Sequence, residues 1–258
     1  MLNTVLHGAP GGAGPSLMIV HGLFGSARNW GAIARRLSDR GQVIVPDMRN
    51  HGDSPWTERH RYPELAGDLA ALIEAQGAGP VDLVGHSMGG KAAMAMALNR
   101  PDLIRRLVIA DIAPVAYGHS QAPLVEAMRG LDTSGLSSRG EADDRLAAKV
   151  ATPGVRAFLL QSLDLKAEPA RWRLNLDTLG REMAHITGWP EMPGRFDRPV
   201  LFLSGAESDY VRPEHRPLIR KAFPEARFAK IPGAGHWLHA EKPREFEATL
   251  RAWLDAEG

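Results

Sequence analysis

Ser87 lies in a sequence context that suits a serine nucleophile. The chain reads Gly85-His86-Ser87-Met88-Gly89, a G-x-S-x-G pattern, after an apolar run from Val81 to Val84 and before small residues from Ala92 to Asn99. This order predicts a strand, a sharp turn and a helix, with the hydroxyl projecting from strained backbone. The turn would place a nucleophile beside backbone N–H groups that can bind developing negative charge.

A serine hydroxyl is a weak nucleophile at neutral pH and requires a general base. Among the 10 histidines, His236 has the most suitable context, because it lies in Gly233-Ala234-Gly235-His236-Trp237, before a final amphipathic segment. That position predicts a loop at the same sheet edge as Ser87. His86 is adjacent to the serine, and its side chain is expected to point elsewhere.

The second donor of an oxyanion hole should come from a loop that follows another strand. The segment His21-Gly22-Leu23 follows the apolar run from Leu17 to Val20. A glycine at position 22 lets the backbone approach closely, so we expect the N–H groups of Leu23 and Met88 to bind the oxyanion. His21 is expected to brace this loop.

A phosphate-binding loop is an alternative interpretation of the segment around Ser87. Gly85, Gly90 and Lys91 fit G-x-x-x-x-G-K, and Asp111 follows an apolar run as a metal-binding aspartate would. However, Ala92 stands where such a loop needs a Ser or Thr hydroxyl to hold Mg²⁺. A P-loop nucleotide-binding protein is therefore the less favoured interpretation.

The composition excludes several other classes of protein. The chain has 258 residues and 0 cysteines, which rules out disulfides, thiolate metal sites and a cysteine nucleophile. Its net charge of +1 provides no field for nucleic acid. His51-Gly52-Asp53 lacks further ligands for a metal and is expected to be a structural turn, so we predict no metal and no cofactor. The sequence predicts no signal peptide and no membrane span, so a cytoplasmic protein is expected.

The arrangement of apolar runs predicts an α/β fold with a mostly parallel, doubly wound sheet. Continuous apolarity is typical of strands buried on both faces of a parallel sheet. Helical spacing occurs between the runs, as at Trp30, Ile33 and Leu37. The predicted strands are Leu17–Val20, Val43–Val45, Val81–Val84, Leu107–Ala110, Val200–Leu203 and a weaker Arg227–Ile231.

A long segment separates the run that ends at Ala110 from the run that begins at Val200. Residues 114–199 contain helical patterns and no convincing strand. We therefore predict a core formed by residues 1–113 and 200–258, with residues 114–199 inserted as a helical cap over the edge where ligands bind. Additional core helices are the alternative.

Together these motifs resemble the α/β-hydrolase superfamily, in the same order and over nearly the whole chain. More narrowly, Arg49-Asn50-His51-Gly52, Gly89-Gly90-Lys91 and Gly235-His236-Trp237 resemble the YbfF-type esterases. The resemblance implies hydrolysis of carboxylic esters or thioesters, without cofactor, through an acyl-serine intermediate. A cofactor-free perhydrolase or C–C bond hydrolase, and a non-catalytic ligand receptor, are the alternatives.

The acidic member of the triad is where the chain departs from the common superfamily pattern. Most relatives have a Gly-x-x-Asp turn after the strand at 200–203, whereas this chain has Gly205-Ala206-Glu207-Ser208, with Asp209 one residue late. The resemblance to YbfF-type enzymes favours Asp111 instead. Asp209 stays open as the alternative acid, and Glu207 is a third choice.

The substrate can be predicted only by class. Phe24, Met88, Trp189 and Trp237 are candidates for an apolar acyl pocket. Residues 114–199 contain equal numbers of acidic and basic side chains, so nothing in their charge selects an ionic substrate. We expect an ester or thioester of a short to medium acyl chain.

Overall fold

A seven-stranded sheet forms the centre of the computed structural model, which describes residues 1–9 and 14–256. The strand order is β1-β3-β2-β4-β5-β8-β9; β1 is antiparallel to β3, and the other neighbours are parallel. The predicted fold class is therefore confirmed. The strands are β1 (Thr4–His7), β2 (Leu17–Val20), β3 (Val43–Pro46), β4 (Val81–His86), β5 (Ile104–Ala110), β8 (Val200–Gly205) and β9 (Ala226–Ile231).

Strand β1 has no counterpart among the predicted strands. It pairs with β3 at the edge of the sheet, and its two central residues, Val5 and Leu6, are exposed. An edge strand of this kind lacks the continuous apolar run that burial on both faces produces. The strands at the centre of the sheet have that run, and β2, β3, β4 and β8 are buried along their whole length.

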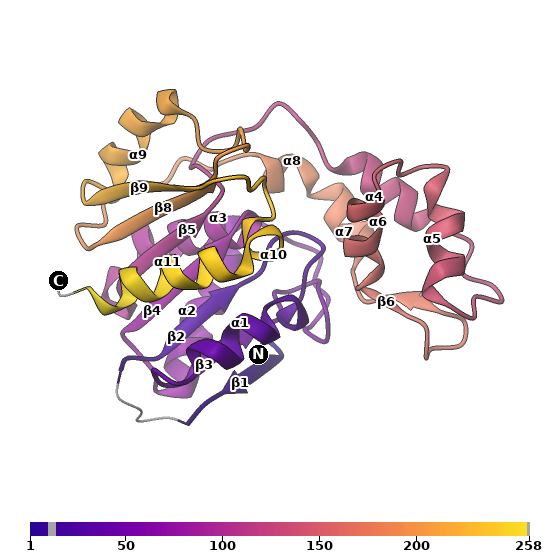
Figure 1. Ribbon diagram of the computed structural model, residues 1–258, viewed down its shortest axis with the longest axis horizontal. Helices are drawn as coiled ribbons and strands as arrows, with labels where there is room; N and C mark the ends of the chain where they lie inside the picture. Colours follow the sequence, from indigo (N-terminus) through magenta and orange to yellow (C-terminus); the bar gives the residue numbers. More distant parts are fainter. Residues whose placement is uncertain (10–13, 257–258) are drawn as a thin grey trace.

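Helices cover both faces of the sheet (Figure 1). In β2, Leu17 and Ile19 pack with α1 (Gly31–Leu37) and α11 (Pro243–Asp255), whereas Met18 and Val20 pack with α2 (Tyr62–Gln76) and α3 (Met88–Asn99). This alternation follows from the two-residue period of a strand. The remaining elements of the core are η1 (Ala27–Trp30), η2 (Pro101–Leu103), η3 (Pro213–His215), α9 (Arg216–Ala222) and α10 (Leu238–Glu241).

The segment between β5 and β8 is mainly helical and lies largely to one side of the sheet (Figure 1). The expectation that it contains no strand is wrong in one detail, because two-residue strands β6 and β7 form a hairpin. Strands this short have no periodic signal in sequence. The division into core and cap stays a prediction. The elements are α4 (Ala122–Arg129), α5 (Arg139–Ala147), α6 (Pro153–Leu160), β6 (Leu163–Asp164), β7 (Arg171–Trp172), α7 (Leu176–Arg181) and α8 (Met183–Thr187).

Lys91 joins the core to the end of this helical segment. Its side chain is 1% exposed, and Nζ donates hydrogen bonds to the carbonyl oxygens of Thr187 (2.9 Å) and Gly188 (2.6 Å). These carbonyls lie at the C-terminus of α8, where the helix dipole favours a positive charge. Burial nevertheless lowers the pKa of Lys91 to about 7, because the charged form loses its hydration.

The lowered pKa of Lys91 predicts a pH-dependent contribution to stability. An unfolded lysine has a pKa near 10.4, so between about pH 7 and pH 10 the unfolded chain binds more protons than the folded chain. The free energy of unfolding of the wild type should therefore rise with pH relative to Lys91→Met, by up to about 1.4 kcal/mol per pH unit.

Urea unfolding of both proteins at pH 7, 8 and 9 measures this difference. Lys221→Met, which removes an exposed lysine from α9, is the matched control and should show no such slope. A difference between wild type and Lys91→Met that stays constant or falls with pH would contradict the prediction.

Candidate active site

Ser87 occupies a strained turn between β4 and α3. Its backbone has φ 53° and ψ −120°, and its N–H donates a hydrogen bond to the carbonyl of Ala110 (3.0 Å). A Cβ atom at Gly85 would lie 2.4 Å from the carbonyl oxygen of Gly89. Only glycine therefore permits α3 to start this close to the strand that precedes the serine.

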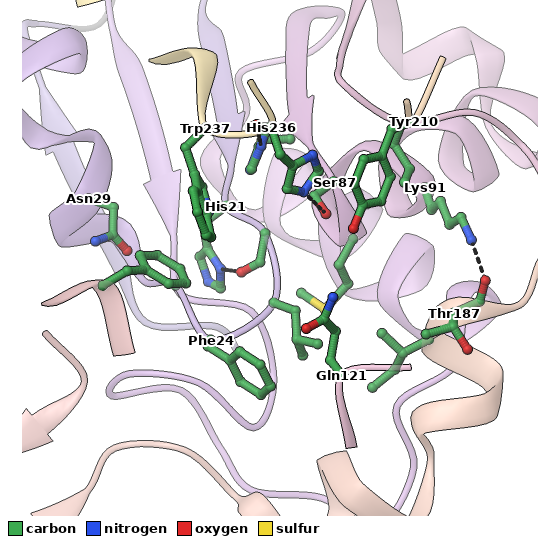
Figure 2. Close-up of a pocket in the computed structure, with 18 of the residues that line it drawn as sticks. His21, Phe24, Asn29, Ser87, Lys91, Gln121, Thr187, Tyr210, His236 and Trp237 are labelled. Carbon is green, nitrogen blue, oxygen red and sulfur yellow. Dashed lines mark hydrogen bonds between the residues drawn. The ribbon is translucent and has the colours of Figure 1, made fainter. Parts of the chain in front are cut away.

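The imidazole of His236 lies between Ser87 and Asp111, and Figure 2 shows it beside Ser87. Its Nε2 atom is 3.1 Å from Ser87 Oγ, and its Nδ1 atom is 2.7 Å from Asp111 Oδ2. Because an ionised carboxylate can only accept hydrogen bonds, Nδ1 carries the proton and Nε2 is free to accept from the serine hydroxyl. Asp111 is 0% exposed, whereas 21% of the His236 side chain is exposed.

The structure brings Asp111, and not Asp209, to the imidazole. Asp209 is exposed, and in the described part of the chain its carboxylate makes no hydrogen bond to His236. Asp111 receives further hydrogen bonds from the Gly205 N–H (3.1 Å) and from Ser208 Oγ. Glu207 is exposed as well.

Ser208 was missed by the sequence reasoning, although a signal for it existed. It occupies the last position of the Gly205-Ala206-Glu207-Ser208 turn, which begins at the last residue of β8, and this is the position of the acid in the expected Gly-x-x-Asp pattern. Its hydroxyl reaches the carboxylate that follows the neighbouring strand β5. A hydroxyl residue at this position therefore indicates a hydrogen-bond donor to the carboxylate after β5, even though it cannot serve as the acid itself.

Two further side chains contact His236: Tyr210, which the sequence reasoning left out, and His86, which was considered there only as a neighbour of Ser87 that points elsewhere. Tyr210 stacks on its ring, with centroids 3.9 Å apart and planes 18° apart. His86 Nε2 donates to the His236 carbonyl (2.9 Å). Since a carbonyl can only accept, His86 is held as the Nε2–H tautomer; burial keeps its pKa well below the usual range, with nearby histidines adding to the effect.

The loop after β2 lies against the serine. A Cβ atom at Gly22 would be 3.2 Å from Ser87 Cβ and 2.9 Å from His86 Nδ1. Among the described residues, neither the Leu23 N–H nor the Met88 N–H donates to a protein acceptor. Both predicted donors therefore lack a protein acceptor in the described part of the chain.

A cavity of about 100 Å³ surrounds these groups. Trp237, Phe24, Gln121 and Tyr210 are among the residues that line it (Figure 2). Phe158 lines it as well, with its ring centroid 5.7 Å from that of Trp237. Phe24, Met88 and Trp237, which were predicted for an acyl pocket, line this cavity.

The predicted pocket contact from Trp189 is wrong. Trp189 lines a separate surface pocket, with its ring 5.8 Å from that of Tyr62. It follows the end of α8, and the direction of its side chain depends on how the helical segment packs on the core. Sequence periodicity contains no information on that packing.

The alternative of a phosphate-binding loop has no geometric support. Lys91 Nζ points away from Ser87 and donates to the backbone carbonyls of Thr187 and Gly188 at the C-terminal end of α8 (Figure 2). Over the ranges 1–9 and 14–256, no group of three or more His, Cys, Asp or Glu side chains is arranged to hold a metal ion.

Within the same ranges, no helix is long and apolar enough to cross a membrane.

Comparison with known proteins identifies the family. Residues 17–249 match the model of the alpha/beta hydrolase family. The chain is 40% identical to esterase YbfF of Escherichia coli strain K12 over 240 residues, which cover 93% of this chain and 92% of that protein. It is 39% identical to the mouse sn-1-specific diacylglycerol lipase ABHD11, over 93% of this chain and 81% of the relative.

A solved structure described as a marine microorganism esterase superposes with a TM-score of 0.92 at 36% identity, over 98% of both chains. The resemblance to YbfF-type esterases is therefore confirmed. The chain belongs to the α/β hydrolase family and is a hydrolase of the carboxylesterase type.

Proposed function

We propose that the protein cleaves esters or thioesters of short to medium acyl chains through an acyl-serine intermediate. The observation that carries the proposal is the pair of contacts made by His236, with Nε2 at Ser87 Oγ and Nδ1 at Asp111. Nucleophile, base and orienting acid are thus linked in hydrogen-bond reach, as nucleophilic acyl transfer requires.

In the proposed reaction, Ser87 Oγ attacks the acyl carbonyl while His236 Nε2 accepts the hydroxyl proton. The imidazolium that forms stays beside the buried carboxylate of Asp111, which stabilises its charge. His236 then transfers the proton to the departing alcohol or thiol. A water molecule attacks the acyl-serine in the second half, with His236 again as the base, and the acid and free Ser87 are released.

The N–H groups of Leu23 and Met88 would bind the oxyanion in both halves of the reaction. Met88 is the first residue of α3, so its N–H lies at the positive end of the helix dipole. Each donor of this kind is worth about 3 kcal/mol of transition-state stabilisation. Ser208 would support the reaction indirectly, since its hydrogen bond holds Asp111 in place.

The cavity supports a small, uncharged acyl group. Its volume of about 100 Å³ is well below the roughly 300–1,000 Å³ of pockets for drug-sized ligands. Phe158 and Trp237 face each other at one side, with ring centroids 5.7 Å apart. A methyl to medium-length acyl chain would contact these rings, and no specific observation favours the perhydrolase, C–C bond hydrolase or receptor alternatives.

Removal of the proposed nucleophile should abolish hydrolysis. Ser87→Ala is expected to lower kcat for p-nitrophenyl butyrate by about 10⁴-fold or more, because no covalent intermediate can form. Ser38→Ala, at the end of α1, is the matched control and should retain wild-type activity. Equal rates in wild type and Ser87→Ala would exclude the mechanism.

The two candidate acids can be separated by isosteric substitution. Asp111→Asn should lower kcat by about 10³- to 10⁴-fold, because an amide no longer stabilises the correct tautomer and the imidazolium of His236. Asp209→Asn should leave kcat within about twofold. The assignment fails if Asp209→Asn loses activity and Asp111→Asn does not; circular dichroism of both variants checks folding.

Phe158 should limit the length of the acyl chain. Phe158→Ala enlarges the apolar part of the cavity, so kcat/KM for p-nitrophenyl octanoate should rise relative to the acetate. Each additional buried methylene contributes about 0.8 kcal/mol, or about fourfold. Phe228→Ala, which removes the same ring from β9, should leave this ratio unchanged; an unchanged ratio in Phe158→Ala would place the acyl chain elsewhere.

A further inference from the structure

His51 is a buried histidine that the proposed reaction does not use. It lies in the segment expected to be a structural turn, is 0% exposed, and faces the loop after β2. We infer that His51 is a positioning residue of the oxyanion hole, which holds the Leu23–Phe24 peptide so that the Leu23 N–H points at the site beside Ser87. This inference rests on the proposed function, since it assigns a role within the same reaction.

The hydrogen bonds of His51 determine its tautomer. The N–H of Phe24 donates to His51 Nε2 (3.2 Å), so Nε2 carries no proton. The carbonyl of Arg49 lies 2.9 Å from His51 Nδ1, so Nδ1 is the protonated nitrogen. Burial keeps the pKa of His51 well below its usual range, and nearby His21 and His60 lower it further. The ring is therefore neutral and able to accept.

The neighbouring peptide is held in a similar way. His21 Nδ1 donates to the carbonyl of Gly22 (2.8 Å), and the Met48 N–H donates to His21 Nε2 (2.9 Å). In a planar trans peptide the C=O and the N–H point in opposite directions. Fixing the Gly22 oxygen therefore fixes the direction of the Leu23 N–H.

His51 is needed because the next residue is strained. Phe24 has φ 64°, a conformation that non-glycine residues rarely adopt. Its N–H is held by His51, and its carbonyl accepts a hydrogen bond from Ser162 Oγ (2.8 Å) of the inserted segment. With the peptides before and after Leu23 both anchored, neither can rotate freely, and the donor stays aimed at the site.

Two substitutions at position 51 separate the two ring nitrogens. In His51→Gln, Oε1 can replace Nε2 as the acceptor for the Phe24 N–H. In His51→Asn, the amide nitrogen can replace Nδ1 as the donor to Arg49, but no acceptor reaches Phe24. Loss of one oxyanion donor costs about 10²- to 10³-fold in kcat, so we expect a partial loss of about 10- to 100-fold for His51→Asn. His51→Gln should stay within about threefold of wild type.

The readout must distinguish positioning from stability. KM for p-nitrophenyl butyrate should change by less than about threefold in His51→Asn, because the effect falls on the transition state. An aryl trifluoromethyl ketone is attacked by the serine hydroxyl and forms a hemiketal whose oxygen is negatively charged. The affinity for this inhibitor should fall by the same factor as kcat. Wild-type kcat and inhibitor affinity in His51→Asn, or equal losses in His51→Asn and His51→Gln, would overturn the inference.

A second change covers the case in which His51→Asn does not fold. Replacement of Phe24 by its α-hydroxy analogue, phenyllactic acid, removes the donor N–H and leaves both side chains intact. It should lower kcat and inhibitor affinity about 10-fold or more, by the same reasoning, and unchanged values would overturn the inference. If the wild type shows no Ser87-dependent hydrolysis, the proposed function fails. If the wild type and the variants are equally active, only the inference about His51 is refuted.

Discussion

The close approach of α3 to the sheet is the constraint on which the candidate site depends. A Cβ atom at Gly85 would lie 2.4 Å from the Gly89 carbonyl oxygen, and one at Gly89 would lie 2.4 Å from the His21 carbonyl oxygen. Backbone therefore contacts backbone at both positions. The turn between them holds Ser87 at a positive φ of 53°, and the contact at Gly89 brings the N-terminus of α3 beside the loop after β2. Nucleophile and predicted oxyanion donors come together as a result of one packing requirement.

The sheet order explains how a carboxylate that follows β5 reaches His236. Strands β4, β5 and β8 are adjacent and parallel, so the residues after them meet at one edge. In this chain Asp111 follows β5, and Ser208 after β8 donates a hydrogen bond to it. The imidazole therefore contacts a carboxylate that follows one strand, and that carboxylate is held by a hydroxyl that follows the neighbouring strand.

Backbone strain and buried neutral histidines occur together around this edge. In the described part of the chain, four residues other than glycine have positive φ: Phe24, Asn50, Ser87 and Asp111. Strained conformations persist where surrounding contacts determine them. His51 supplies such a contact to Phe24, and Asn50 accepts a hydrogen bond from the Thr57 N–H through its side chain. Burial keeps the His51 imidazole neutral, so its Nε2 atom can accept the hydrogen bond from the Phe24 N–H. The loss of hydration at His51 therefore supports the conformation of the loop after β2.

Residue types and their local spacing were sufficient to predict the fold class, the central strands, Ser87 as the candidate nucleophile and His236 as the candidate base. Strands buried on both faces need continuous apolar runs, and a nucleophile at a strand-to-helix turn needs small residues around it. Both signals are formed by residues close together in the sequence, so they can be recognised without the tertiary structure. The edge strand β1 lacks such a run and was missed. Only the tertiary structure shows that Asp111 contacts His236 and that Asp209 is exposed, because Asp111 lies 125 positions from His236 in the sequence. The contacts of Ser208, Tyr210 and Trp189 also became visible only in the tertiary structure. Packing between segments far apart in the sequence produces no periodic pattern in a single sequence.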